Sequence, residues 1–485
     1  MNTKNPKKIT KIHMGPARFS LDLCDGSERG EYVDQDYILH ALGRPHRAIN
    51  LMYCYYPNDE GWPQRASVAF KDKKVGFAWD YPYDDYFPYG GGLNGSSDAE
   101  VFRQIKEIRR HGMDVILTLT IDPKVSDDHL RAIGRDLRKF GRIEVRINHE
   151  ATGNWFSFNK RASYAEVGQF FCHASKLIKE EAPNVKTIIC IGGIEDLKSD
   201  KITMEEEFKD TIPEADIWSV DKYLSLHWGW PYDVAEMGGK SFGRYPVREV
   251  YEKTKRSWKR YTELNNGVPK PFVMSELNAD ADVTGPYDQI RMMKEFTKLL
   301  KEDPDNWFTG FTFYQFRDRG RLGLETEDPN NKYVGIRQPL MDYYIELLND
   351  PDFMPVVTEE KAIKAGEKTE LRFGASDDAE GIAMEFELSD KPVFFEAYFE
   401  NEAVEYNLML EVNGQWFYKA PGTKCIDMME AFYKKKAPKD GRVSVKLFAP
   451  PKTGENEDDP LNYRTVIKEL PKFRIEYEPV MKRQK

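Results

Sequence analysis

The sequence predicts an α/β fold, a (β/α)8 TIM barrel followed by a C-terminal antiparallel β-sandwich. Residues 47–350 alternate short β-branched runs with amphipathic helical stretches, the pattern of parallel βα units. From about residue 368, segments with period-two alternation are separated by turn signals, among them Asn413-Gly414 between two apolar runs. The chain has 485 residues, more than one core holds, since single cores stop growing at about 250 to 300 residues.

Each barrel strand is expected where a short apolar run is bounded by helices or turn residues. We expect the first strand at residues 48–55, a second near 75–80 and the others at 113–121, 143–150, 185–191, 216–223, 272–276 and 308–316. Between or after them, helices are expected from about residue 98 to 110, from 163 onward, and at 247–264, 287–300 and 339–348. The domains that follow are an N-terminal extension at 1–45, the barrel at 46–350 and the sandwich at 355–485, with a linker near 349–352.

Charge and hydropathy exclude two classes of partner. The net charge is −10 and the pI is near 5.6, so an electropositive face for nucleic acid is not expected. Mean hydropathy is −0.66 and no apolar stretch approaches the roughly 18 residues of a membrane span. No secretory signal is visible at the N-terminus, so we expect a secreted or periplasmic protein if a leader was removed and a cytoplasmic one otherwise. The oligomeric state is open.

The cysteines indicate neither a disulfide framework nor a metal site. They are five in number and scattered, with no CxxC spacing. We therefore expect no metal and no cofactor.

Two glutamates, Glu150 and Glu276, each close a short apolar run. The chain between them fits three βα units of roughly 40 residues, which would place them on strands 4 and 7. Acids at the carboxyl ends of barrel strands share one face of the barrel, where such folds keep their chemistry. We expect both side chains to face one pocket.

Paired carboxyls across a cleft are suited to splitting a glycosidic bond. One donates a proton to the leaving oxygen, while the other attacks the anomeric carbon or activates water. Arg146 lies four residues before Glu150 on the same strand face and can hold a carboxylate ionised, with Glu276 as the recipient. The pair His149-Glu150 also suggests a zinc peptidase, but position 153 is Gly where HExxH needs a second His.

Residues 146–156, Arg-Ile-Asn-His-Glu-Ala-Thr-Gly-Asn-Trp-Phe, resemble the strand 4 signature of glycoside hydrolase family 26 in clan A. The resemblance implies a (β/α)8 barrel and a retaining double displacement, with Glu150 as acid/base and Glu276 as nucleophile. It also implies that His149 bonds a sugar hydroxyl and that Tyr223, in Val220-Asp221-Lys222-Tyr223, bonds the nucleophile. A retaining mechanism predicts carboxyl groups about 5 to 5.5 Å apart.

Further residues are candidates for substrate binding because their rings or charges are expected at the barrel mouth. They are Trp155 after strand 4, His227, Trp228 and Trp230 after strand 6, and Tyr314 and Arg317 at strand 8, where the clan often has a Trp. Packing within the loops is the competing interpretation for these rings, and ordinary pairing with Asp318 and Glu325 or Glu327 is the competing interpretation for Arg317. Mannan is the usual substrate of the family, whereas arginines at the mouth would suit an anionic or sulfated algal galactan of the carrageenan or agar type.

The leading hypothesis is a retaining, endo-acting β-glycoside hydrolase that cleaves a polysaccharide or oligosaccharide. A non-catalytic carbohydrate-binding protein on a barrel scaffold is the alternative, since a fold alone does not fix a function. For the sandwich, Trp416, Phe417 and Tyr418 suggest a sugar-binding module. Alternation along a strand turns at least one of these rings inward, which favours an accessory domain packed against the barrel.

Overall fold

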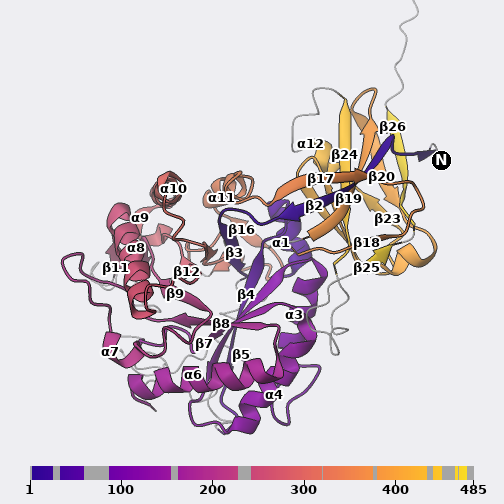
Figure 1. The fold of residues 1–485 in the computed structure, drawn as a ribbon. Coiled ribbons are helices and arrows are strands. Elements are labelled where there is room, and N and C mark those ends of the chain that lie inside the picture. The colour runs from indigo at the N-terminus through magenta and orange to yellow at the C-terminus, as the bar shows by residue number, and fades with distance from the viewer. Residues whose placement is uncertain are drawn as a thin grey trace, which may run out of the picture.

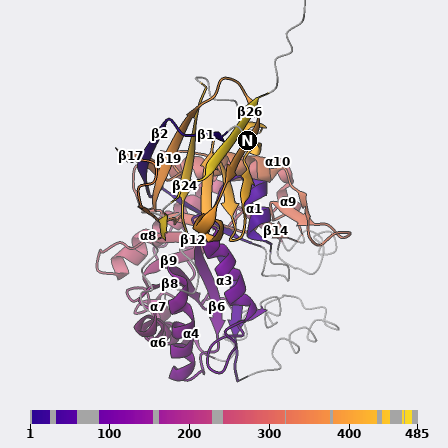
Figure 2. The ribbon, with the colours of Figure 1, turned by 90° about the vertical axis from the view of Figure 1, so that its right-hand side faces the viewer.

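The computed structural model has two lobes, a barrel and a smaller β-sandwich (Figures 1 and 2). The structure describes residues 3–25, 33–58, 87–153, 162–227, 242–318, 320–374, 379–433, 441–450, 465–467 and 469–477. Within these residues, no helix is long and apolar enough to cross a membrane.

Eight parallel strands form the closed barrel predicted from the sequence. In barrel order they are β3 (Ser20–Cys24), β4 (Ala48–Tyr55), β6 (Asp114–Ile121), β7 (Ile143–Ile147), β8 (Val185–Cys190), β9 (Ile217–Asp221), β12 (Phe272–Leu277) and β13 (Gly310–Phe313). Pairing of β3 with both β13 and β4 closes the ring. The barrel strands are apolar runs because one face packs inside the barrel and the other against the surrounding helices. In β6, all eight residues are buried.

The first barrel strand differs from the sequence prediction. Residues 48–55 form the second strand, and the first is the short β3, which the prediction missed. Asp22 in β3 is buried and accepts hydrogen bonds from Arg47 Nε and Nη2 at 2.9 and 2.6 Å. The strand has only five residues, and Asp22 in its middle interrupts the apolar run by which a strand is recognised. The charge of Asp22 is neutralised by Arg47, which lies 25 residues later in the chain. The expected strand at 75–80 lies outside the described residues.

Helices cover the outside of the barrel. They are α1 (Gln35–Leu42), α3 (Glu100–Arg110), α4 (Asp127–Leu137) with the 3-10 turn η3 (Arg138–Phe140), α6 (Tyr164–Glu181), α7 (Glu205–Phe208), α8 (Val247–Leu264), α9 (Ala281–Thr284), α10 (Pro286–Glu302) and α11 (Leu340–Leu348). Helix α6 begins at a capping box in which Ser163 and Glu166 satisfy each other's backbone donors. Its buried stripe includes Phe170, Phe171 and Ile178, which pack on the barrel.

The loops that follow the barrel strands contain short strands of their own. They are β5 (Phe87–Pro88) after β4, the pair β10 (Ser225–His227) and β11 (Phe242–Arg244) after β9, and β14 (Arg317–Asp318), β15 (Glu325–Glu327) and β16 (Gly335–Arg337) after β13. These loops lie at the carboxyl ends of the barrel strands, so they surround the mouth of the barrel.

The second lobe contains two antiparallel sheets, as the turn-rich pattern after residue 368 predicts. One sheet has the order β17 (Val356–Ala362), β2 (Lys8–Gly15), β19 (Ala379–Glu387), β24 (Arg442–Phe448), β21 (Leu408–Val412) and β22 (Gln415–Lys419). The other has the order β1 (Thr3–Lys4), β26 (Lys472–Tyr477), β20 (Pro392–Tyr398) and β23 (Cys425–Asp427). A third pair joins β18 (Thr369–Leu371) to β25 (Thr465–Ile467), and η4 (Asn401–Glu405) and α12 (Glu430–Tyr433) connect strands. The expected hairpin joins β21 and β22 through Asn413-Gly414.

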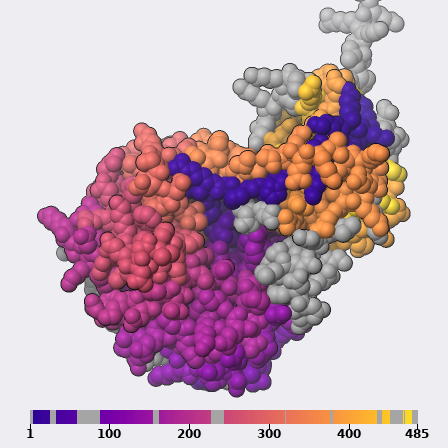
Figure 3. Space-filling model, in the orientation of Figure 1, coloured from indigo at the N-terminus to yellow at the C-terminus, as the bar shows by residue number. Residues whose placement is uncertain are grey.

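Residues 1–45, expected as an N-terminal extension, divide between the two lobes. Strand β2 pairs with β17 and β19 inside the sandwich, and β3 begins the barrel only a few residues later. In Figure 1 the indigo β2 lies among orange strands, and Figure 3 shows the N-terminal segment crossing the surface from one lobe to the other. The chain therefore crosses between the lobes here as well as after α11.

The two lobes are joined by apolar contacts and by a backbone hydrogen bond. Leu39 of α1 clusters with residues of the sandwich sheet that include Met409 and Trp416, and the Trp416 amide donates to the Gly43 carbonyl at 2.8 Å. The rings of His111 and Tyr418 lie 4.1 Å apart between centroids. Trp416 itself is buried between Phe373 and Phe448. The ring of Trp416 thus serves packing near the barrel and is not presented to solvent.

Candidate active site

The two glutamates lie on barrel strands 4 and 7, as the spacing predicts. Glu276 is in β12, and Glu150 follows β7 by three residues. The backbone turns sharply before Glu150: Asn148 and Glu150 have φ of 58° and 42°, and the Asn148 carboxamide oxygen accepts from the Ile121 amide at 2.8 Å. A left-handed glutamate is unfavourable unless its surroundings hold it, and such conformations are typical of functional sites.

Arg146 organises the floor of the site. Its guanidinium is fully buried and donates to Glu276 Oε1 at 2.8 Å, to Asp221 Oδ2 at 3.1 Å and to Thr118 Oγ1 at 2.9 Å. One buried positive charge thus serves two carboxylates from strands 6 and 7. A buried arginine paired in this way favours the ionised form of its partners.

The imidazole of His149 lies between the two glutamates. Its Nδ1 is 2.6 Å from Arg146 Nη2 and 3.3 Å from Glu276 Oε1, and its Nε2 is 3.8 Å from Glu150 Oε2. Burial and the charge of Arg146 lower the pKa of His149 well below its usual range, so the ring is neutral. Because arginine can only donate, Nδ1 is the acceptor and the proton is on Nε2, on the Glu150 side.

Glu276 has a second donor in Tyr223, whose hydroxyl donates to Oε2 at 2.7 Å. Tyr223 follows β9, and its ring meets the ring of Tyr314 edge-on at a centroid distance of 6.0 Å. Both carboxylate oxygens of Glu276 therefore accept a hydrogen bond from a fixed side chain. This arrangement fixes the orientation of the Glu276 carboxyl group.

Glu150 lies in a contrasting environment. Its Oε2 is buried and has no hydrogen-bond partner among the described residues. Burial, followed by the charges of Asp221 and Glu276, raises the pKa of Glu150 well above its usual range. A carboxyl of this kind holds its proton near neutral pH and can give it to a neighbouring atom.

Asp221, at the end of β9, belongs to the site although the sequence prediction passed over it. Burial, followed by the charge of Glu276, raises the pKa of Asp221 to about 7 against the pull of Arg146. The thiol of Cys190, in β8, hydrogen-bonds Asp221, and burial raises the pKa of that thiol well above its usual range. The signal for Asp221 was present, since it is an acid at the carboxyl end of a strand, the same criterion that selected Glu150 and Glu276.

Three of these side chains could in principle share a cation. Ligand atoms of His149, Asp221 and Glu276 lie within 4.8 Å of one another. The Arg146 guanidinium already contacts all three residues, however, and its positive charge would repel a metal ion at their centre. The residues therefore fit an arginine-centred site better than a metal site.

Arg317 is not available to substrate, contrary to the expectation from sequence. Its guanidinium is buried and donates to Glu325 Oε2 at 2.9 and 3.2 Å, over the ring of Tyr37. Lys222 likewise pairs with Glu195. The competing interpretation, ion pairing within the loops, is thus correct for Arg317, and of the candidate acids it is Glu325 that β15 carries beside the guanidinium.

The remaining predicted residues cannot be placed. Trp155, Trp228 and Trp230 lie outside the described residues, and of His227 only the backbone, in β10, is described. Their roles in substrate binding stay predictions.

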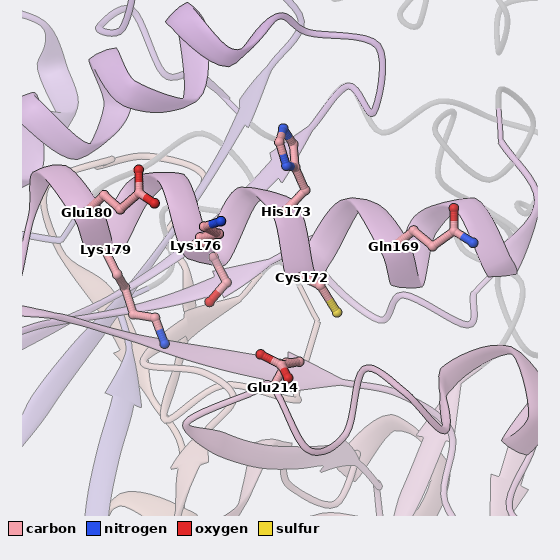
Figure 4. A pocket seen from close by; sticks show the side chains of 8 residues that line it. Gln169, Cys172, His173, Lys176, Lys179, Glu180 and Glu214 are labelled. Atoms are coloured by element: carbon pink, nitrogen blue, oxygen red, sulfur yellow. The ribbon is translucent and has the colours of Figure 1, made fainter.

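A surface hollow of about 730 Å³ lies elsewhere, along the outer face of α6 (Figure 4). Its lining includes Cys172 and Glu214, which point toward each other across it, and Lys179, which pairs with Asp216 at 3.0 Å. Helix α6 packs on the outside of the barrel, so this hollow is separate from the glutamates.

Neither a protein-family model nor a curated protein matches the sequence. Solved structures similar to the chain include a family 26 β-mannanase from Bacteroides ovatus, with 11% identity, TM-score 0.41, and coverage of 70% of this chain and 90% of that one. A modular family 26 endo-β-1,4-mannanase from Cellulomonas fimi has 10% identity, TM-score 0.40 and coverage of 93% of both chains. A family 51 α-L-arabinofuranosidase from Bifidobacterium longum has 11% identity, TM-score 0.43, and coverage of 93% and 97%. The functional argument below rests on the geometry of the site.

Proposed function

We propose that this protein is a retaining β-glycoside hydrolase in which Glu276 is the nucleophile and Glu150 the acid/base. The observation that carries the proposal is the difference between the two carboxyls. Glu276 receives hydrogen bonds from Arg146 and Tyr223, whereas Glu150 has a buried oxygen without a hydrogen-bond partner among the described residues and a raised pKa. Two carboxyls whose surroundings separate their pKa values are the requirement for acid and nucleophile roles.

In the first step, Glu276 attacks the anomeric carbon while Glu150 gives its proton to the leaving oxygen. The glycosidic bond breaks, the leaving sugar departs with the proton, and a covalent glycosyl-enzyme forms. The guanidinium of Arg146 and the hydroxyl of Tyr223 hold the two oxygens of Glu276 in place before the attack.

In the second step, Glu150, now ionised, takes a proton from water, and that water attacks the anomeric carbon. The ester bond to Glu276 breaks and the carboxylate regains its hydrogen bonds. The neutral His149 has its Nε2 proton on the Glu150 side, where it can donate to a sugar hydroxyl or to the ionised carboxylate without adding a charge.

The proposed substrate is an uncharged β-linked polysaccharide of the mannan type, cleaved internally. The motif at residues 146–156 supports this class, and the ion pairs of Arg317 and Lys222 remove two cations that a sulfated galactan would need. The competing function is a non-catalytic carbohydrate-binding protein, which requires no separation of the two pKa values.

The test is reducing-sugar release from mannan, mixed-linkage glucan, xylan, agar and carrageenan by wild type and by Glu276→Ala. We expect release from mannan by wild type, a loss of about 10⁴-fold or more in the variant, and a first product of retained configuration by NMR. Glu249→Ala, on the outer helix α8, is the matched control and should behave as wild type. Binding of a polysaccharide without hydrolysis by wild type would favour the competing function, and an inverted first product would overturn the retaining mechanism.

A further inference from the structure

Two exposed tyrosines lie beside the site and take no part in the chemistry above. Tyr245 and Tyr287 are 40% and 81% exposed. Tyr245 follows β11 in the loop after barrel strand 6, and Tyr287 is in the first turn of α10, after barrel strand 7. Both segments belong to the mouth of the barrel, because the helices that follow barrel strands begin at that face.

Backbone hydrogen bonds connect Tyr245 directly to the wall that holds Glu276. The Tyr245 amide donates to the Leu224 carbonyl at 2.9 Å, and the Leu224 amide donates to the Asn278 carbonyl at 2.8 Å. Leu224 is the neighbour of Tyr223, whose hydroxyl bonds Glu276. Two backbone hydrogen bonds thus tie the segment of Tyr245 to the segment that carries Tyr223 and to the chain just after Glu276.

An ion pair between sequence neighbours of the two tyrosines ties their segments together. Arg244, which precedes Tyr245, pairs with Asp288, which follows Tyr287. Gly243 adds a constraint on the first ring: a Cβ at this position would collide with the Tyr245 hydroxyl, so the ring lies back over the Gly243 backbone. The orientation of Tyr245 is therefore set before any ligand arrives, which reduces the entropy lost on binding.

We propose that Tyr245 and Tyr287 form an outer sugar-binding subsite that holds the polysaccharide chain beyond the residues flanking the cleaved bond. Tyrosine rings present a large apolar face with a hydroxyl at the edge, which matches the C–H face and the hydroxyl rim of a pyranose. This inference rests on the proposed function and deepens it, because such a subsite serves a polymer and gives nothing to a short glycoside.

The experiment separates polymer binding from chemistry. In a Glu276→Ala background, the variants Tyr245→Ala and Tyr287→Ala are run by affinity electrophoresis in gels that contain mannan, mixed-linkage glucan or xylan. We expect each substitution to weaken retardation in one gel by about 3- to 10-fold in dissociation constant. Tyr433→Ala, which removes an exposed tyrosine (67%) from α12 of the sandwich, is the control and should leave retardation unchanged.

A second measurement uses the active enzyme. With Glu276 intact, Tyr245→Ala and Tyr287→Ala should lower kcat/KM on the polymer by a similar factor and leave kcat/KM on a 4-nitrophenyl monoglycoside unchanged. Equal retardation of all variants, no retardation of the parent in any gel, or equal losses on polymer and monoglycoside would overturn the subsite. Tyrosine-dependent retardation by a protein that hydrolyses nothing would keep the subsite and overturn the proposed hydrolase.

Discussion

The wall at barrel strand 4 and the wall at barrel strand 7 carry the same functional group in opposite surroundings. On the strand 7 wall, Glu276 has a donor on each oxygen and a buried guanidinium beside it. On the strand 4 wall, Glu150 has a strained backbone, a buried oxygen that lacks a hydrogen-bond partner among the described residues, and two acids nearby. The chemistry assigned to each glutamate thus comes from its neighbours, since the two side chains are identical.

The largest effect is expected when the two glutamate variants are compared on substrates with different leaving groups. Glu150→Ala should lose about 10² to 10⁴-fold in kcat/KM on polysaccharide, because the leaving oxygen is no longer protonated. On a 2,4-dinitrophenyl glycoside, whose leaving group needs no proton, the first step should be nearly restored and a burst of phenolate should appear. Glu276→Ala should be inactive on both substrates. Equal losses for the two variants on the activated substrate would remove the distinction between the walls.

Removing the shared cation should be costly to stability. Arg146→Met leaves Glu276 and Asp221 buried without their counter-charge, and breaking a buried pair costs about 3 to 5 kcal/mol. The free energy of unfolding from denaturant titration at pH 7 should fall by this amount. Arg131→Met, which removes a partly exposed arginine from α4, should leave it nearly unchanged. A small effect at Arg146 would show that the two acids are not ionised together.

Tyr223→Phe isolates one hydrogen bond on the strand 7 wall. A hydrogen bond to a charged group contributes about 1.5 to 3 kcal/mol, so kcat/KM should fall by roughly 10- to 150-fold. The ring contact with Tyr314 does not involve the hydroxyl and is retained. The matched substitution Tyr343→Phe, on α11, removes a hydroxyl that bonds Thr297 and should leave kcat/KM unchanged.

The smallest expected effect is a change in pH dependence from Asp221→Asn. The pKa of Asp221 is about 7 in the folded protein and near the ordinary aspartate value when unfolded. The folded state therefore binds more protons between these values, so this group lowers stability as pH rises from about 4 to 7. The variant should lose that decline when unfolding is followed by melting temperature against pH.

The same substitution reports on the strand 4 wall. Loss of the Asp221 charge lowers the pKa of Glu150, so the basic limb of the kcat/KM profile should move to lower pH. An unchanged limb would mean that Asp221 does not act on Glu150.

The comparison of walls also shows how far the sequence alone could go. Strand 3 of the barrel was predictable because residues 115–121 are all apolar or β-branched, as a strand buried on both faces requires. Glu150, Glu276 and Arg146 were predictable because strand ends and strand faces follow from local periodicity. Strand 1 was not, because the charge of Asp22 is compensated by Arg47 only in the folded chain.

Contacts between loops were the second feature that could not be predicted from the sequence. The sequence offers Asp318, Glu325 and Glu327 as partners for Arg317, but the choice of Glu325 depends on the pairing of β14 with β15. The electrostatic repulsion among Glu150, Asp221 and Glu276 likewise arises only because the fold brings three barrel strands together. Local sequence patterns therefore located the site, but only the folded structure shows which of its charged side chains are paired and which can take part in chemistry.

The interleaved strand β2 has a consequence for how a ribosome delivers this chain. Met14 of β2 pairs with Ala379 of β19, so an interior strand of the sandwich emerges first and waits for a partner roughly 365 residues downstream. At about 5 to 20 residues per second, that wait is roughly 20 to 70 seconds. During translation the barrel can close while β2 stays unpaired, and the second lobe can be completed only after β26 has been made.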